Sequence, residues 1–199
     1  AHKIMRKVWG GMPQKADIHT ERWNQVADHV NSNFYHIDMD RYSLESVLAK
    51  GAELVKRKGI KCLVIDPFNK VRATTANDSD VNKYTMEYLM QIETFARKHD
   101  VLVIIVAHPT KMYKNDKGVI EVPTMYNIKG GGEWYDASYH GLVVHRNYLN
   151  KTVMVKVLKV KFQNLGENGA EVHFKWNPES GGYIPHEQVS LEGAKLPWE

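Results

Sequence analysis

The sequence predicts an α/β fold, because two uninterrupted apolar segments flank a long amphipathic helix pattern. The apolar segments are residues 62–65 and 101–107, and neither alternates polar with apolar side chains. Such runs are typical of parallel strands that are covered on both faces. Between them, apolar side chains recur at helical spacing over residues 81–99. Strand, helix and strand in this order predict a right-handed crossover between two parallel strands.

The segments that precede this crossover are predicted to be mainly helical. Two helices are expected within the first 33 residues, separated by a break at 10–13, and Thr20 caps the second. Residues 34–37 are a short strand candidate. An amphipathic helix with a serine cap is expected over 43–59, where a glycine ends it.

The last third of the chain changes to a period of two residues, which indicates antiparallel strands. We expect strands over 141–145 and 151–162, followed by a turn that contains two glycines at 163–169. Apolar and polar residues then alternate over 171–176. The expected architecture is therefore a parallel α/β core followed by an antiparallel β-hairpin at the C-terminal edge.

Composition narrows the class of protein. The 199 residues suit one domain, or one domain with an appendage. Cys62 is the single cysteine, which excludes an internal disulfide framework and fits a reducing, intracellular compartment. The net charge of +4 permits a polyanionic partner without requiring one. No apolar run is long enough to span a membrane, and the start without methionine leads us to expect a piece of a longer protein.

Two polar residues follow the two predicted parallel strands. Asp66 ends the first strand, at the edge where open α/β sheets bind ligands, and such an aspartate holds Mg²⁺ through water in nucleoside triphosphatases. His108 ends the neighbouring strand and could bond a γ-phosphate or the attacking water. The alternatives are an aspartate that opens a turn before Pro67 and a histidine bonded only to backbone.

Two further groups of residues suggest contact with an anion. Lys159 and Lys161 project from the same face of their strand, where a phosphate chain or a solvated surface would suit them. The long connection over 108–134 carries lysines and aromatic residues in a pattern that suits single-stranded nucleic acid, although a mobile solvated loop would look similar. Its residues of interest are Lys111, Tyr113, Lys114, Lys117, Tyr126 and Lys129.

Two kinds of site are missing from the sequence. It contains no G-x-x-x-x-G-K-[ST] phosphate loop, and the glycine run at 130–132 does not replace one. The histidines are scattered, so a structural metal site is not expected.

Six motifs read in order give a resemblance to a known family. They are CLVIDPFN at 62–69, FARKH at 95–99, VIIVAHPTK at 103–111, GGGEWYD at 130–136, GLVVHRN at 141–147 and VLKVKF at 157–162. Their order resembles the RecA-like motor domain of DnaB-type replicative helicases. The branch with the strongest likeness contains phage and plasmid primase–helicases and the mitochondrial Twinkle helicase, and the resemblance runs over about residues 1–183.

The resemblance implies a role for each candidate residue at the ATP site. Asp66 matches the Walker B acid that coordinates Mg²⁺, and His108 matches the sensor of the γ-phosphate. Arg146 matches an arginine close to the nucleotide. Lys159 and Lys161 match the pair that reaches into the neighbouring subunit's site, with Lys161 in place of the usual arginine finger. Because lysine lacks the bidentate fork of arginine, activation of the neighbour is expected to be weaker.

The resemblance also implies partners and an extent. Lys111, Lys114 and Lys129 belong to loops that hold single-stranded DNA in the channel of a ring, usually a hexamer, with ATP and Mg²⁺ as cofactors and no membrane partner. We expect a partial RecA-like motor domain over 1–185, incomplete at its N-terminus, and a tail over 186–199. A bacterial, phage or plasmid origin and a cytoplasmic location are expected.

The Walker A loop and the catalytic glutamate of the family precede the matched segment. The resemblance therefore implies the C-terminal part of a primase–helicase that is inactive in isolation. Two other functions remain open at this point: a RecA-like ATPase regulator of the KaiC or RepA type, and a nucleic-acid-binding module without enzymatic activity.

Overall fold

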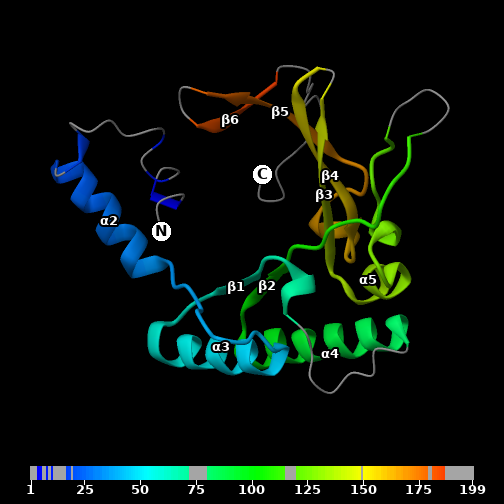
Figure 1. Ribbon diagram of the computed structural model, residues 1–199, viewed down its shortest axis with the longest axis horizontal. Helices are drawn as coiled ribbons and strands as arrows, with labels where there is room; N and C mark the ends of the chain where they lie inside the picture. Colours follow the sequence, from blue (N-terminus) through cyan, green and yellow to red (C-terminus); the bar gives the residue numbers. More distant parts are fainter. Residues whose placement is uncertain are drawn as a thin grey trace. The chain divides into compact units, whose positions relative to one another are not determined.

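The computed structural model describes residues 4–5, 8, 10, 17–18, 20–71, 80–114, 120–148, 150–178 and 181–186. The chain divides into two compact units. The crossover unit consists of residues 37–141 and 158–162, and the described residues outside these ranges belong to the hairpin unit. The helices and strands (Figure 1) are α2 (Glu21–Asn33), α3 (Leu44–Lys58), β1 (Cys62–Ile65), α4 (Val81–His99), β2 (Leu102–Ile105), α5 (Gly131–Ala137), β3 (His140–Asn147), β4 (Thr152–Val160), β5 (Glu171–Asn177) and β6 (Gly182–Pro185). Short 3₁₀ helices are η2 (Phe68–Lys70), η3 (Met125–Asn127) and η4 (Gln163–Leu165).

The predicted crossover is present. β1 and β2 are parallel and pair from Cys62 with Leu102 to Ile65 with Ile105, and α4 connects them. The carboxylate of Asp80 accepts hydrogen bonds from two backbone N–H groups in the first turn of α4, as an N-cap does. Figure 1 shows α3 and α4 on the same side of the two strands.

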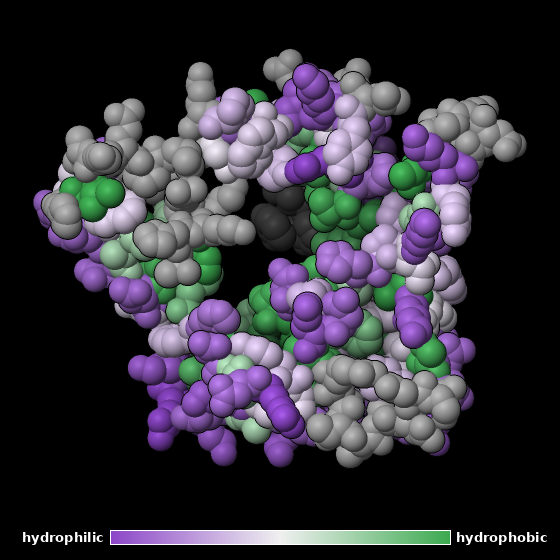
Figure 2. Space-filling model, in the orientation of Figure 1, coloured by the Kyte–Doolittle hydropathy of each residue, from purple (hydrophilic) through white to green (hydrophobic). Residues whose placement is uncertain are grey.

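The two strands are covered on one face only. Leu63 and Ile65 are buried against the helices, whereas Val64, Leu102 and Ile104 are 55%, 58% and 43% exposed. The uninterrupted apolar runs predict cover on both faces. Because α3 and α4 pack on the same side, no second layer lies over the other face within the described residues of the crossover unit. Apolar surface is visible in Figure 2 where Figure 1 places β1 and β2.

The C-terminal strands form a separate antiparallel sheet of four strands in the order β3-β4-β5-β6. Pairing runs from Thr152 with Lys175 to Lys156 with Glu171, and Phe174 then pairs with Pro185 on β6. The predicted hairpin is therefore confirmed and is extended by one strand on each side. In the described part of the chain, this sheet is not continuous with β1 and β2, in contrast to the single sheet expected.

The expectations for the N-terminal segments are met in part. α2 is capped by Thr20, whose hydroxyl oxygen accepts a hydrogen bond from the backbone N–H of Trp23 at 3.2 Å. The strand predicted at 34–37 is wrong: the segment is extended but belongs to no β-ladder of the described residues. The expected break at 10–13 and nearly all of the tail at 186–199 lie outside the described residues.

Candidate functional site

The structure brings Asp66 and His108 to the same edge of the parallel sheet. The backbone N–H of Val106 donates to the carbonyl of Ile65 at 2.9 Å, and that of Phe68 donates to the carbonyl of Val106 at 2.8 Å. The two chains therefore stay paired just beyond the strands, Asp66 lies between these hydrogen bonds, and His108 follows two residues after Val106. Both candidate side chains are exposed. This edge is the carboxyl end of both strands, as predicted.

A buried aromatic cluster supports this edge. The Phe68 ring contacts the rings of Tyr88 on α4 and Trp134 on α5 edge to face, each with 4.8 Å between centroids. The indole N–H of Trp134 donates to the carbonyl of Lys129 at 3.1 Å. The segment that begins with Asp66 is thus packed directly against the helix that follows the long connection, which links the two predicted functional regions.

The long connection folds back on itself as an antiparallel arm, which we call the basic arm (residues 109–128, described at 109–114 and 120–128). Pro109 pairs with Ile128, and Lys114 pairs with Ile120. The backbone N–H of Thr110 donates to the carbonyl of Asn127 at 2.7 Å. The arm therefore begins directly after His108, at the edge that carries Asp66.

The three lysines predicted to contact DNA lie on this arm or just beyond it. Lys111 and Lys114 are exposed on the outgoing strand, and Lys129 lies directly after the returning strand and is partly exposed. The ammonium of Lys111 lies 5.5 Å from the centroid of the Tyr113 ring. The arrangement presents cations and exposed aromatic rings together on one segment.

The glycine run after the arm has a packing role. Gly130 has a φ of +81° and begins α5, and a Cβ there would overlap the Thr85 side chain on α4. A Cβ at Gly131 would overlap the backbone of Tyr126. Glycine therefore permits α5 to approach both α4 and η3 closely, and Trp134 can then reach the aromatic cluster.

Lys159 and Lys161 both face the segment from α5 to β3. The Lys159 ammonium donates to the carbonyls of Tyr135 and Asp136 and lies 4.6 Å from the centroid of the Tyr135 ring. The Lys161 ammonium lies 4.0 Å from the centroid of the Tyr139 ring. A cation at these carbonyls is favourable because the C-terminus of a helix carries partial negative charge. Lys159 thus has carbonyl partners within its own unit.

Arg146 lies in the other unit, on β3. Its guanidinium donates to the hydroxyl of Tyr183 at 3.2 Å and lies 5.9 Å from the centroid of the Tyr148 ring. The hydrogen bond with Tyr183 is the main reason why the pKa of Arg146 is raised above its usual value. In the structure this arginine is therefore held by two tyrosines of its own unit.

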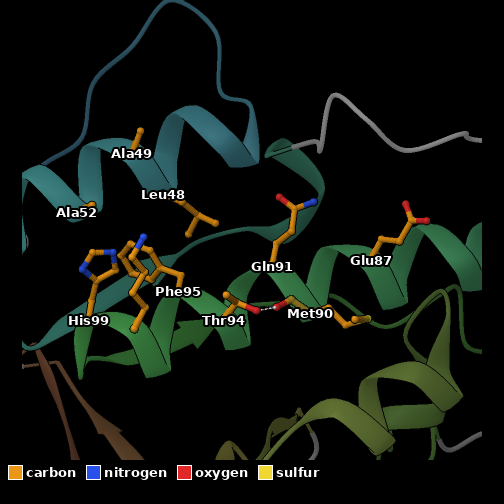
Figure 3. Close-up of a pocket in the computed structure, with 10 residues that line it drawn as sticks. Leu48, Ala49, Ala52, Glu87, Met90, Gln91, Thr94, Phe95 and His99 are labelled. Atoms are coloured by element: carbon orange, nitrogen blue, oxygen red, sulfur yellow. Dashed lines mark hydrogen bonds between the residues drawn. The ribbon is translucent and has the colours of Figure 1, made fainter.

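An open groove lies between α3 and α4 and contains none of the predicted site residues (Figure 3). Figure 3 shows Phe95 and His99 close together at one end of it and Glu87 at the other. Its lining consists of Leu48, Ala49, Ala52, Glu87, Met90, Gln91, Thr94, Phe95, Lys98 and His99.

The donor set at the sheet edge suits Mg²⁺ rather than a metal held by protein alone. No group of three or more metal-ligating side chains occurs among the described residues. Mg²⁺ commonly keeps several waters and binds one carboxylate together with substrate phosphates, and Asp66 offers one exposed carboxylate. Of the helices that the structure describes, none has the length and apolar character needed to cross a membrane.

The inward-facing members of this region were not expected from the sequence. Phe68, Tyr88, Trp134 and Tyr135 position the sheet edge and the arm, although only Asp66, His108 and the lysines carry an obvious chemical signal. The signal available in the sequence is the concentration of aromatic residues on both sides of the glycine run.

The fold is that of RecA-like helicase ATPase domains. The chain superposes on the ATPase domain of a DnaB-like helicase with a TM-score of 0.69 and 17% identity, over 94% of this chain and 69% of that one. A DnaB-like replicative helicase, described together with its interactions with primase, superposes with a TM-score of 0.64 and 17% identity, over 92% of this chain and 47% of that one. A KaiC-like protein of Pyrococcus horikoshii superposes with a TM-score of 0.53 and 16% identity, over 83% and 65% of the two chains.

The sequence is similar to one particular relative within this class. It is 30% identical over 162 residues to the Twinkle homolog protein, chloroplastic/mitochondrial, of Arabidopsis thaliana. The alignment covers 77% of this chain and 22% of that protein, so the chain spans about a fifth of the relative's length. No protein-family model matches the chain. The resemblance to the motor domain of Twinkle and DnaB-type helicases, expected from the motifs, is thereby confirmed.

Proposed function

We propose that the chain forms part of the motor of an ATP-driven replicative DNA helicase that translocates on single-stranded DNA. The observation that carries the proposal is the position of Asp66 and His108 at one carboxyl edge of a parallel crossover. The sequence similarity to a Twinkle homologue and the fold shared with DnaB-like ATPase domains support the same function.

The proposed roles at this edge follow from the chemistry of the two side chains. Asp66 is the Walker B acid and holds Mg²⁺ through water, and the ion neutralises charge on the phosphates when it is bound. His108 donates a hydrogen bond to the γ-phosphate, and it is followed directly by the basic arm. Occupancy of the nucleotide position can therefore be transmitted to the arm through consecutive residues. The phosphate loop, which this sequence does not contain, is supplied from outside the chain.

The same proposal assigns residues to the interface with a neighbouring subunit in a hexameric ring. Lys161 is the better placed of the two lysines to reach a neighbour, because its ammonium lies over the ring of Tyr139 whereas two carbonyls hold Lys159. Arg146 lies near the nucleotide. These roles, the motor domain over 1–185 with its tail, and a phage or plasmid origin with a cytoplasmic location rest on the resemblance.

Lys111, Lys114 and Lys129 are proposed to contact the phosphates of single-stranded DNA. All three are at least partly exposed, and they lie within or just beyond a single arm. Contacts of this kind bind without regard to sequence and weaken as salt is added, because counterions are released from the nucleic acid. A motor that moves along DNA needs both properties.

The function is tested by ATP hydrolysis of the full-length gene product with and without single-stranded DNA. We expect Asp66→Asn to lower the DNA-stimulated rate by about a hundredfold or more, since transition-state charge stabilisation is worth several kcal/mol. Asp100→Asn is the matched control, because Asp100 precedes β2 at the opposite edge and asparagine also tolerates its φ of 50°. The isolated 199-residue chain is expected to show no hydrolysis.

Three results would contradict the proposal. Hydrolysis that survives Asp66→Asn removes the role of the aspartate. Hydrolysis by the isolated chain that is abolished by Asp66→Asn contradicts the need for an external phosphate loop. Hydrolysis without stimulation by DNA or strand separation would favour a regulator of the KaiC type, whose fold this chain also shares.

A further inference from the structure

Two tyrosines at the base of the basic arm form a stacked pair. The rings of Tyr126 on η3 and Tyr135 on α5 lie 5.2 Å apart at an interplanar angle of 20°. The Tyr135 ring is fixed by a second contact: the ammonium of Lys159 lies 4.6 Å from its centroid and donates to the carbonyls of Tyr135 and Asp136. A cation over an aromatic face and two hydrogen bonds restrict the motion of that side chain and of the helix end.

The other ring of the pair is open to solvent. Tyr126 is 61% exposed although its ring stacks on Tyr135. An aromatic ring that is held in place by a partner and exposed on its other side offers a flat, preorganised surface to a planar ligand. Its conformational entropy is already reduced, so a ligand that stacks on it loses less entropy on binding.

The stacked pair lies beside the cations of the arm. Pro109 pairs with Ile128, and Asn127 accepts hydrogen bonds from both the N–H and the hydroxyl of Thr110, at 2.7 and 2.9 Å. In this antiparallel register, the next facing positions are Lys111 and Tyr126. A phosphate bound by the lysine would therefore be held beside an exposed aromatic ring, which is the arrangement of phosphate and base within a nucleotide chain.

We propose that Tyr126 is a base-stacking site for single-stranded nucleic acid, with Tyr135 and Lys159 as its support and Lys111 as the neighbouring phosphate contact. This inference rests on the proposed function and deepens it, since phosphate contacts alone do not distinguish a single strand from a duplex. Stacking requires an unpaired base with an open face, and it tolerates any base because every base has a π-face. The site thus selects for strand state and leaves sequence free.

The proposal is tested with two fluorescent oligonucleotides of equal length and charge, oligo-dT and an entirely abasic strand. Binding of each to the full chain is measured by fluorescence anisotropy over a range of salt concentrations. We expect Tyr126→Leu to weaken binding of oligo-dT about tenfold, to leave binding of the abasic strand unchanged and to leave the salt slope unchanged. Tyr126→Phe, which retains the ring, is expected to bind both strands as the unaltered chain does.

Two control variants separate stacking from charge. Tyr113→Leu removes another exposed ring of the arm, one over which Lys111 lies, and is expected to have less than about a twofold effect on the preference for oligo-dT. Lys111→Gln is expected to weaken both strands equally and to reduce the salt slope by about 0.7, the value for one phosphate contact on a single strand.

The outcomes distinguish this inference from the proposed function. If the unaltered chain binds oligo-dT and the abasic strand equally, or if Tyr126→Leu weakens both by the same factor, the stacking site is wrong and the phosphate contacts stand. If neither strand binds with a measurable salt dependence, the single-strand binding of the proposed function is itself wrong.

Discussion

The hydroxyl group of Tyr88 lies in the core beneath the candidate nucleotide edge. The side chain is fully buried, and its hydroxyl oxygen has no hydrogen-bond partner among the described residues. Burial is the main cause of a raised pKa for Tyr88, because the ionised form would lose its hydration. The ring is what the fold uses, since it contacts the Phe68 ring edge to face at 4.8 Å. The polar atom adds a desolvation cost without a compensating bond.

Replacing this hydroxyl is expected to stabilise the chain. Tyr88→Phe keeps the ring contact and removes the desolvated group, so the free energy of unfolding should rise by about 1 kcal/mol. Tyr88→Leu loses the aromatic contact and leaves a cavity, so it should lower that free energy by about 2 kcal/mol. Urea unfolding followed by circular dichroism measures both. A marked loss of stability in Tyr88→Phe would show that the hydroxyl has a partner in solution.

At the scale of elements, α5 is the piece on which the site depends. It has only seven residues, far fewer than an isolated helix needs in water. Its stability comes from contacts at both ends: Trp134 packs into the aromatic cluster, and Lys159 binds the carbonyls at the C-terminus. The same helix holds Tyr135 against Tyr126. A short helix therefore connects the edge that carries Asp66 with the base of the basic arm.

The two lysines of the expected neighbour-reaching pair should differ in their effect on stability. Lys159→Met removes hydrogen bonds to two carbonyls and a cation at a helix C-terminus, and it should lower the free energy of unfolding by about 1 kcal/mol. Lys161→Met removes a contact with one exposed ring and should change it by less than about 0.5 kcal/mol. Thermal or urea unfolding of the two variants tests this. Equal effects would mean that Lys159 is not engaged at α5 and is as free as Lys161 to reach a neighbour.

At the scale of the whole molecule, the sequence predicted the elements whose signals are local. The crossover over β1, α4 and β2 follows from uninterrupted apolar runs, a helical period and the cap at Asp80. The position of Asp66 and His108 at one edge follows from the parallel direction of the strands alone. The register of the antiparallel strands likewise follows from alternation that places one side-chain set on each face.

The features that the sequence did not predict depend on contacts between distant residues. Lys159 reaches a carbonyl 24 positions earlier, and no local pattern distinguishes such a lysine from one that is exposed on a strand. The segment at 34–37 has strand-forming residues, yet a strand also requires a hydrogen-bonded neighbour, which the described chain does not provide. The bare face of Val64, Leu102 and Ile104 is similar: hydrophobicity specifies that a face should be covered but does not supply the cover.

The central claim is that nucleotide phosphates and their metal ion bind where Asp66 and His108 meet, at one edge of β1 and β2. The most direct test is paramagnetic relaxation of histidine ring signals in the full-length gene product, with Mn²⁺ and a non-hydrolysable ATP analogue in place of Mg²⁺ and ATP. Because the effect falls steeply with distance from the ion, the account predicts strong broadening of His108 and little of His99, which ends α4 at the opposite edge. Equal broadening of the two, or stronger broadening of His99, would contradict it.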